Sequence, residues 1–309
     1  MKSFIYSDDN KRYHTLSYHN KHVYGRKVYK AVIDAGFTCP NIDGTKGRGG
    51  CIFCDGGSGY FTSGALSVTE QLSREKERIT KKVPNADIVA YFQAHTNTYA
   101  DISVLERLYR EAEAFGVKGI SVATRADCIS SETVSLLKGL SVPVTVELGL
   151  QSVHDTTAAL INRGHTYAEF IKAYELLKSA GIRICVHIIN GLPRETGDMM
   201  LETAKVLGRL KPDGIKIHLL HVIRGTKLAE MYEKGEYTPL SKDEYVDIVV
   251  KQLEYIPPET VIERITGDGD KAKLVAPLWS MDKISVLGAI DVKQKESDSF
   301  QGKRYNEKT

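Results

Sequence analysis

Short runs of apolar, β-branched residues alternate along the chain with segments in which apolar residues recur every three or four positions. The runs are typical of buried strands, and the spacing between them is typical of amphipathic helices, as at Leu105, Leu108 and Ala112. Six runs predict strands, at residues 28–34, 87–93, 118–124, 142–150, 182–189 and 214–220. The chain therefore reads as a β-then-α unit repeated six times.

Local signals mark where several helices begin and end. A Ser or Thr followed three residues later by Glu predicts a capping box at a helix start. Three such pairs occur: Ser67 with Glu70, Thr166 with Glu169, and Ser241 with Glu244. Gly181 in "SAGIRI" predicts a helix end directly before the strand at 182–189.

Repeated β/α units predict parallel strands with right-handed crossovers, covered by helices because the strands are apolar on both faces. A partial barrel and an open doubly wound sheet both fit this α/β pattern. After residue 240 the rhythm changes to a long helix, a short strand in "TVIERI" and a last helix near 280–295. We therefore divide the chain into an N-terminal strap (1–27), a core (28–240) and a small α+β C-terminal appendage with its tail (241–309).

Composition places the chain among soluble globular proteins, with 42% hydrophobic and 26% charged residues in 309. No apolar run approaches the roughly 18 residues of a membrane span, and the start "MKSFIYSDDNKRYHTL" lacks the apolar core of a signal peptide. An odd number of cysteines, three of them in one loop, argues against a disulfide framework. We expect a reduced, cytoplasmic protein without a membrane partner; the sequence leaves its oligomeric state open.

Residues 36–57, "GFTCPNIDGTKGRGGCIFCDGG", hold three cysteines directly after the first predicted strand. Loops after strands form the active-site face of β/α barrels. The glycines of this loop allow it to fold back, so that the sulfurs of Cys39, Cys51 and Cys54 converge on one object.

That object is either zinc or an iron–sulfur cluster. Structural zinc takes four protein ligands, and no second C-x-x-C is present to supply the fourth. A [4Fe–4S] cluster on three thiolates keeps one iron open for a substrate or cofactor. The spacing favours the cluster. We expect Cys128 and Cys185, within or just after apolar runs, to be small buried hydrophobes.

The triplet ends in "CIFC", and the chain also carries "GFTCPNIDG", "QAHTNTYA", "TRADC", "ELGLQS", "INRGH", "GLPRET" and "GDGDKAKLVAPLW". As a set, from about residue 10 to residue 295, these motifs resemble the radical S-adenosylmethionine (radical SAM) superfamily, and within it the YtqA/YhcC group. That group is similar to the catalytic subunit of Elongator and, more distantly, to oxygen-independent coproporphyrinogen oxidase.

The resemblance implies a partial (β/α)6 TIM-like barrel and two cofactors, a [4Fe–4S] cluster and S-adenosylmethionine. It also implies the chemistry: reduction of the cluster cleaves S-adenosylmethionine, and the resulting 5′-deoxyadenosyl radical removes a hydrogen atom from the substrate. An electron donor such as flavodoxin or ferredoxin is then a further partner.

Site residues follow from the resemblance, position by position. Cys39, Cys51 and Cys54 would hold the cluster as catalytic and metal ligands, and Phe53 would lie against the adenine. Gln151 and Arg163 match cofactor-contacting positions, with Arg163 suited to the methionine carboxylate. Their alternatives are a strand-end hydrogen bonder for Gln151 and a helix cap for Arg163.

Two departures from the superfamily pattern affect the site. The usual Gly-Gly-Glu stretch is replaced by "FQAHTNTYA", so we expect Gln93, Thr96 and Asn97 to bind the methionine amine by other contacts. His187 stands where the oxidase family has a cofactor-binding aspartate; its alternative is a core histidine bonded to a backbone carbonyl.

Three further polar residues interrupt or end apolar strands. Glu147 shares a face with Thr145 and Gly149, which we take as the barrel interior. An unpaired charge there is costly, so the pattern favours a cofactor or substrate role for Glu147 over a structural ion pair. His218 and His221, at the end of the sixth strand, either reach the substrate or are structural.

The substrate expectation is tRNA. Residues 11–30 carry six Lys or Arg and no acid, interleaved with Tyr and His, a pattern that can bind phosphates and stack on bases. The structural alternative is a strap whose tyrosines pack on the barrel. The resemblance implies tRNA wobble-uridine maturation, in which a 5-carboxymethylaminomethyl group becomes aminomethyl. A small-metabolite radical SAM enzyme and a non-catalytic iron–sulfur protein are the other readings.

Overall fold

The computed structural model describes residues 4–55, 64–267 and 269–306. Residues 1–3 of the predicted strap and 307–309 of the predicted tail lie outside the described residues. None of the described helices is both long and apolar enough to cross a membrane.

A parallel sheet of seven strands organises the chain, in the order β1-β2-β3-β4-β5-β6-β8. The strands are β1 (Val28–Ile33), β2 (Asp87–Phe92), β3 (Ile120–Arg125), β4 (Val144–Gln151), β5 (Arg183–Asn190), β6 (Gly214–Leu219) and β8 (Val261–Ile265). All six predicted core strands are confirmed.

The seventh strand corrects the sequence analysis, which assigned "TVIERI" to the appendage. In the structure β8 lies beside β6, with Val261 opposite Gly214. The short strand itself was predicted, but it was not assigned to the barrel because Glu263 and Arg264 interrupt the apolar run that marks the other strands. The barrel sheet thus has one strand more than the six repeated units suggest.

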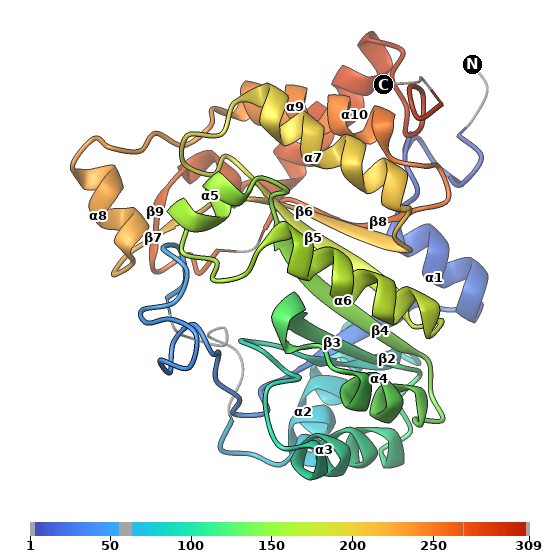
Figure 1. The fold of residues 1–309 in the computed structure, drawn as a ribbon. Helices are drawn as coiled ribbons and strands as arrows, with labels where there is room; N and C mark the ends of the chain where they lie inside the picture. Colours follow the sequence, from blue (N-terminus) through green and yellow to red (C-terminus); the bar gives the residue numbers. More distant parts are fainter. Residues whose placement is uncertain (1–3, 56–63, 268, 307–309) are drawn as a thin grey trace.

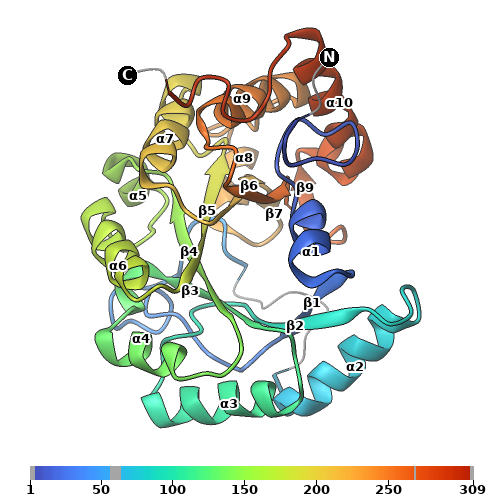
Figure 2. The same ribbon diagram turned by 90° about the vertical axis from the view of Figure 1, so that its right-hand side faces the viewer.

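The sheet curls into an open half-barrel with its helices on the outer side (Figures 1 and 2). An open doubly wound sheet would carry helices on both faces, so the partial barrel is the correct alternative. The helices between strands are α2 (Val68–Thr80), α3 (Ile102–Ala114), η1 (Ala126–Cys128), α4 (Ser131–Lys138), α5 (Asp155–Leu160), α6 (Tyr167–Ser179), α7 (Gly197–Leu210), α8 (Lys227–Glu233) and α9 (Lys242–Tyr255).

The predicted helix ends are confirmed. Ser67, Thr166 and Ser241 cap α2, α6 and α9, each in a complete capping box. Gly181 follows α6 with a φ of 71°, a left-handed conformation that glycine adopts without strain.

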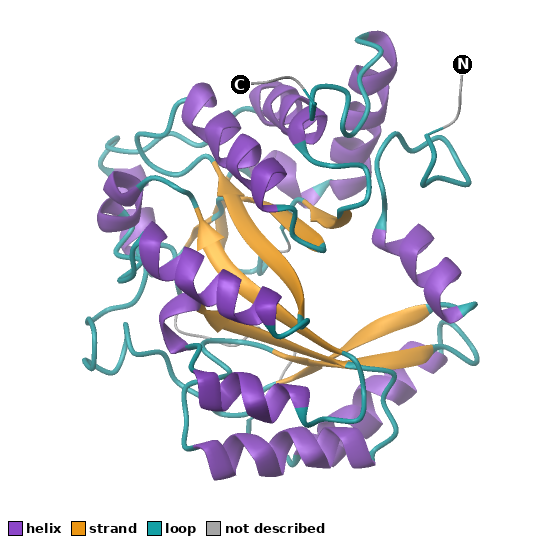
Figure 3. Ribbon diagram, turned by 45° about the vertical axis from the view of Figure 1, so that its right-hand side comes forward, coloured by secondary structure: helices purple, strands orange, loops and turns teal. Residues whose placement is uncertain are grey.

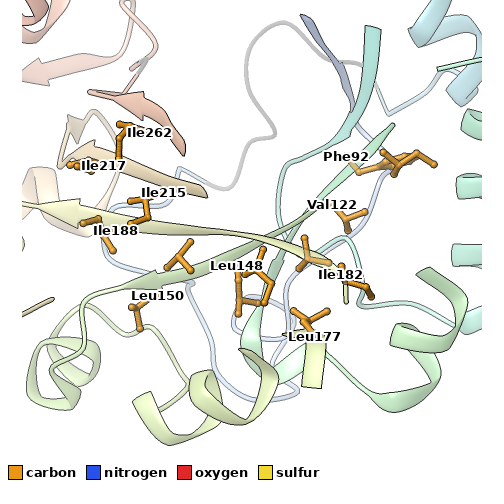
Figure 4. Close-up of a cluster of buried hydrophobic side chains, with 14 of the residues drawn as sticks. Phe92, Val122, Leu148, Leu150, Leu177, Ile182, Ile188, Ile215, Ile217 and Ile262 are labelled. Atoms are coloured by element: carbon orange, nitrogen blue, oxygen red, sulfur yellow. The ribbon is translucent and has the colours of Figure 1, made fainter. Parts of the chain in front are cut away.

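The core lies between the strands and the outer helices (Figure 4). Leu148 of β4 and Leu177 of α6 are both fully buried there, and each such side chain contributes about 1.5–3 kcal/mol by leaving water. Cys185 on β5 is also fully buried, as predicted.

A small α+β region follows the barrel. The short strands β7 (Val222–Ile223) and β9 (Leu274–Ala276) pair antiparallel, and η2 (Leu278–Met281) and α10 (Lys283–Glu296) complete it. Helix α10 packs on α9, which packs on α7 of the barrel. The C-terminal elements therefore continue the packing of the barrel.

The N-terminal strap lies between the two edge strands. Helix α1 (Leu16–Tyr24) contacts both β1 and β8, and Thr15 pairs with Ile262 of β8 (Figures 2 and 3). Tyr13 and His14 just before it are buried, and the His14 ring bonds the Glu259 carbonyl at 3.1 Å. This arrangement supports the reading of the strap as a segment packed on the barrel.

Candidate active site

The cysteine loop between β1 and α2 lies across the carboxyl ends of the strands, the face where β/α barrels place their chemistry. The Ile52 amide donates to the Ile161 carbonyl at 3.1 Å, and the Leu228 amide donates to the Ile52 carbonyl at 2.8 Å. Ile52 and Phe53 also pack in a small apolar cluster with Leu220, which follows β6. The loop is thus docked on segments that follow β4 and β6.

Two asparagines hold the loop to the "INRGH" segment. The Asn41 amide nitrogen donates to the Asn162 carbonyl, and the Asn162 amide nitrogen donates to the Gly50 carbonyl at 2.7 Å. Gly164 permits this contact, because a Cβ added there would lie 2.8 Å from Asn41 Oδ1. Sequence reasoning missed this clamp; its only signal was the presence of both asparagines within motifs noted for other residues.

We expect Asn162→Gly to weaken retention of a metal cluster by about 10–100-fold, the usual effect of losing a residue that supports metal ligands. Glycine accepts the φ of 53° at this position, so the variant loses only the amide. Iron content after a chelator challenge measures the effect. Asn85→Gly is the matched control, since Asn85 is exposed and has a φ of 62°. Equal iron retention in the two variants would contradict the clamp.

The three cysteines of the loop are half-buried and form no disulfide. The Cys54 amide donates to the Cys51 carbonyl at 2.9 Å, which places the two cysteines on one turn. Burial raises the pKa of Cys51 to about 12, the neighbouring Cys54 adds to this rise, and the Arg125 guanidinium opposes it. Cys39 also interacts with Cys51.

These thiols suit an iron–sulfur cluster better than zinc. Within the described part of the chain, no three His, Cys, Asp or Glu side chains, the loop cysteines included, are already closed around a metal position, and no fourth protein ligand for structural zinc stands with them. Three neighbouring cysteines on a clamped loop are the donor set that a [4Fe–4S] cluster with one open iron takes.

Arg125 at the end of β3 is a site residue that sequence reasoning missed. Its guanidinium pairs with both carboxylate oxygens of Asp127, at 3.0 and 2.9 Å, and donates to the Arg163 carbonyl at 2.6 Å. Lys46 of the cysteine loop binds the same Asp127 at 2.8 Å. Together these contacts place one positive charge near the thiols and tie the loop to β3. The available signal was a basic residue directly after a strand, in "TRADC".

Arg163 lies beside the cysteine loop, and its contact with the methionine carboxylate stays a prediction. It is 1% exposed, and its guanidinium donates to the carbonyls of Leu150, Ser152 and His165. Burial lowers the pKa of Arg163 to about 10. Main-chain oxygens accept from Nε and Nη1 of the guanidinium, and Nη2 lies 3.5 Å from the Asp155 carboxylate. Arg163 thus joins the end of β4 to the segment that clamps the loop.

The predicted residues after β2 lie beside the cysteine loop, because the Thr96 amide donates to the Thr38 carbonyl at 3.2 Å. Thr96 and Asn97 are fully buried, yet Thr96 Oγ1 and Asn97 Oδ1 have no hydrogen-bond partner among the described residues. The Asn97 amide nitrogen is held by the carbonyls of Ala94 and Ala123, at 2.7 and 2.9 Å. Buried polar atoms without partners are costly, so these two atoms fit a bound polar group. Gln93, directly after β2, is half-buried.

Gln151 ends β4 in a left-handed conformation, with a φ of 61°. Its side-chain amide folds back over Gly149, where an added Cβ would lie 2.7 Å from Gln151 Nε2. Glycine at 149 is therefore needed for this rotamer. Gln151 lies at the carboxyl end of the barrel, as predicted, and Phe53 is half-buried on the cysteine loop.

His187 and Glu147 lie in the barrel interior and bind each other, with His187 Nε2 2.7 Å from Glu147 Oε2. The His187 ring therefore contacts a carboxylate and not the backbone carbonyl of the alternative reading, and its role in cofactor binding stays a prediction. Burial, with Lys216 nearby, lowers the pKa of His187.

Glu147 corrects the sequence analysis, which favoured a cofactor or substrate role. Its carboxylate is 1% exposed and accepts from the ammonium groups of Lys30 and Lys216 and from the Ser121 hydroxyl. Although burial alone would raise it, Lys216 and Lys30 hold the pKa of Glu147 well below its usual range. Glu147 is the centre of a structural ion cluster.

The ion cluster continues toward the amino ends of the strands. Glu263 pairs with Lys30 at 2.8 Å and with Arg183 at 2.7 Å. Lys30, Arg183 and Glu263 also line a cavity of about 1030 Å³ beneath α1, at the amino ends. The cavity lies at the amino ends of the strands, with the ion cluster as one wall, and is therefore separate from the site at the carboxyl ends.

Comparison with known proteins agrees with this geometry. Residues 42–207, more than half of the chain, match the radical SAM superfamily, and residues 212–296 match the radical SAM C-terminal domain. The chain is 47% identical to YtqA of Bacillus subtilis, over 98% of this chain and 95% of YtqA. It is 35% identical to YhcC of Escherichia coli, over 87% of each chain.

Two partial likenesses extend this result. A tRNA uridine(34) acetyltransferase of Methanocaldococcus jannaschii is 31% identical over 48% of this chain and 28% of that protein. The solved structure of Elp3 from the archaeon Methanocaldococcus infernus superposes with a TM-score of 0.68 at 20% identity, over 89% of this chain and 64% of that one. At this identity the structural match establishes the fold alone.

The matched region contains Cys51 and Cys54, and the similarity to YtqA runs over nearly the whole chain. The fold, the docked cysteine loop and these matches agree: the chain belongs to the radical SAM superfamily, and it is a radical SAM enzyme.

Proposed function

We propose that this enzyme acts on the wobble uridine of tRNA, converting a 5-carboxymethylaminomethyl group to aminomethyl. The observation that carries the radical chemistry is the clamped loop with Cys39, Cys51 and Cys54 at the carboxyl ends of the strands. The cluster supplies, when bound, the electron that cleaves S-adenosylmethionine and so yields the 5′-deoxyadenosyl radical.

Different residues of this chain would bind the cluster and S-adenosylmethionine. Cys39, Cys51 and Cys54 would hold the cluster. Thr96 and Asn97, with their unpartnered buried oxygens, would bind the polar end of S-adenosylmethionine, together with Gln93 and Gln151 near the same face. Phe53 would cover the adenine. Arg163 acts as a positioning residue, since its guanidinium fixes main-chain carbonyls beside the loop.

The substrate part of the proposal rests on relatives. A protein named for its action on tRNA uridine 34 shares 31% identity with about half of this chain. The strap contributes less than its sequence suggested. Lys11 pairs with Asp291 at 2.6 Å and Lys21 with Asp8 at 2.7 Å, while Lys30 lies in the barrel. Each of these ammonium groups already has a carboxylate partner, with which a phosphate would have to compete.

We expect tRNA binding to weaken with salt, because counterions are released from each phosphate that the protein neutralises. The log–log slope should be about −0.9 for each such phosphate. The test variant replaces four basic residues of the strap with glutamine: Arg12, Lys21, Arg26 and Lys27. We expect the slope to change by less than the contribution of one phosphate, because three of these residues already have acidic partners. The pairs are Arg12 with Asp298, Lys21 with Asp8, and Arg26 with Asp87. Affinity against salt for the two proteins measures this; a flat wild-type slope would remove tRNA as partner.

Product formation is the test of the proposed reaction. Reduced, reconstituted enzyme should release 5′-deoxyadenosine faster when tRNA bearing 5-carboxymethylaminomethyluridine is added, and the aminomethyl nucleoside should accumulate. tRNA lacking the modification serves as the control. Release that no tRNA stimulates would leave the radical SAM assignment intact and favour a small-metabolite substrate.

A further inference from the structure

Neither the proposed iron–sulfur cluster nor the ion cluster around Glu147 accounts for two histidines at the end of β6. His218 is in β6, and His221 follows it between Leu220 and Val222, which pack in the same apolar cluster as Ile52 of the cysteine loop. Both imidazoles are therefore at the carboxyl end of the barrel, on the side of β6 and β8.

Each imidazole has an unmet hydrogen-bonding group. Both residues are half-buried, and the Nε2 atom of each is buried without a hydrogen-bond partner among the described residues. A buried polar atom left in this state costs about 1–3 kcal/mol. The ring of His218 lies 5.2 Å from that of His187, centroid to centroid, so the imidazoles extend the polar interior toward the mouth of the barrel.

The backbone after β8 approaches the two rings closely. A Cβ added to Gly269 would lie 3.0 Å from His221 Nδ1, and one added to Gly267 would lie 3.2 Å from His221 Cε1. Side chains at these positions would push against the ring of His221. The glycines thus keep this corner of the mouth narrow and lined by imidazoles and main chain.

The ion cluster below this corner carries a net positive charge. It has three cations, Lys30, Lys216 and Arg183, against two carboxylates. Burial lowers the pKa of both histidines, and nearby cations add to this effect: Arg264 and Lys216 for His218, and Lys283 for His221. Neutral imidazoles keep one N–H donor each, and a positive surrounding field favours an anionic acceptor.

We propose that His218 and His221 bind an anionic oxygen group of the substrate, a carboxylate or a phosphate, at the carboxyl end of β6. This inference deepens the proposed function, since a carboxymethylaminomethyl group carries a carboxylate, and it rests on that function for assigning the ligand to the substrate. Binding would supply the missing partners of the two imidazoles.

Small probes test the site without tRNA. Saturation-transfer NMR on the reconstituted enzyme would compare sarcosine, which carries a carboxylate, with sarcosinamide, which does not; phosphorus NMR would follow inorganic phosphate. We expect wild-type enzyme to prefer sarcosine or phosphate over sarcosinamide. His218→Leu and His221→Leu should each weaken that binding by about tenfold or more, the usual effect of removing a hydrogen bond to a charged group.

Matched variants separate binding from folding. His218→Gln and His221→Gln keep a side-chain N–H at a similar reach and should retain most of the affinity, while His22→Leu, on the exposed face of α1, should retain all of it. Iron content and thermal unfolding of every variant show whether the barrel is intact.

The outcomes are distinct. Stronger binding of phosphate than of sarcosine identifies a phosphate as the group, and the reverse identifies a carboxylate. Two results would overturn the inference. In the first, both leucine variants bind sarcosine and phosphate as tightly as the wild-type enzyme does. In the second, the wild-type enzyme binds sarcosine no better than sarcosinamide and does not bind phosphate. If the leucine variants lose probe binding but no tRNA stimulates 5′-deoxyadenosine release, the proposed substrate fails and the anion site stands.

Discussion

Replacing Cys39, Cys51 or Cys54 with alanine is expected to abolish both the cluster and the cleavage of S-adenosylmethionine. Each variant leaves only two thiolates on the loop, whereas a [4Fe–4S] cluster with one open iron needs three. The loop should still dock, because the asparagine contacts that hold it do not involve the sulfurs. Iron and sulfide content, the visible absorption spectrum and 5′-deoxyadenosine release measure the loss.

The two remaining cysteines provide the controls. Cys185 is fully buried in β5, and Cys128 is half-buried in η1 beside Asp127. The half-burial of Cys128 differs from the buried position predicted for it, because it lies in a short 3-10 helix after β3 and not in the strand. Cys128→Ala and Cys185→Ala should keep the cluster. A full cluster in any of the three loop variants would contradict the assignment of ligands.

Replacing Glu147 with leucine is expected to destabilise the fold by about 3–5 kcal/mol, the typical cost of removing one partner from a buried ion pair. The variant would leave Lys216, which is 3% exposed, without its carboxylate, and would also remove a partner from Lys30. Denaturant unfolding under anaerobic conditions gives the free energy of unfolding. Glu202→Gln is the control, because the exposed pair of Glu202 and Arg209 should contribute no more than about 1 kcal/mol.

The same cluster has a defined pH dependence. The folded-state pKa of Glu147 lies well below its usual value, so its contribution to stability is present above the pKa of the unfolded chain and is lost as the pH falls through the folded pKa. Wild-type stability should therefore fall more steeply with acid than that of Glu147→Leu. Parallel curves for the two proteins would mean that Glu147 does not hold the barrel interior by charge.

Periodic signals explain how far the fold could be predicted. The six core strands are near-continuous apolar runs, and the capping boxes at α2, α6 and α9 depend only on local geometry, so both were predictable. Strand β8 was predicted as a short strand, but its place in the barrel sheet was not recognised, because Glu263 is stabilised by Lys30 of β1 and Arg183 of β5. No local pattern reveals such partners.

The candidate site likewise has features that the sequence predicts and features that depend on the folded backbone. The cysteine triplet is visible as spacing within one loop, and its position after β1 follows from the order of elements. The clamp between Asn41 and Asn162 joins residues that lie 121 positions apart, and no local pattern marks either asparagine as the partner of the other. Arg163 was recognised as a site residue, but its three main-chain acceptors depend on the path of the backbone after β4.

The central claim is that Cys39, Cys51 and Cys54 hold a [4Fe–4S] cluster whose fourth iron is open to S-adenosylmethionine. The most direct test is electron paramagnetic resonance of the anaerobically reconstituted and reduced enzyme, recorded with and without S-adenosylmethionine. We predict one [4Fe–4S]⁺ signal for each chain, with g values that shift when S-adenosylmethionine is added. Tightly bound zinc without iron, or a cluster signal that S-adenosylmethionine leaves unchanged, would contradict the claim.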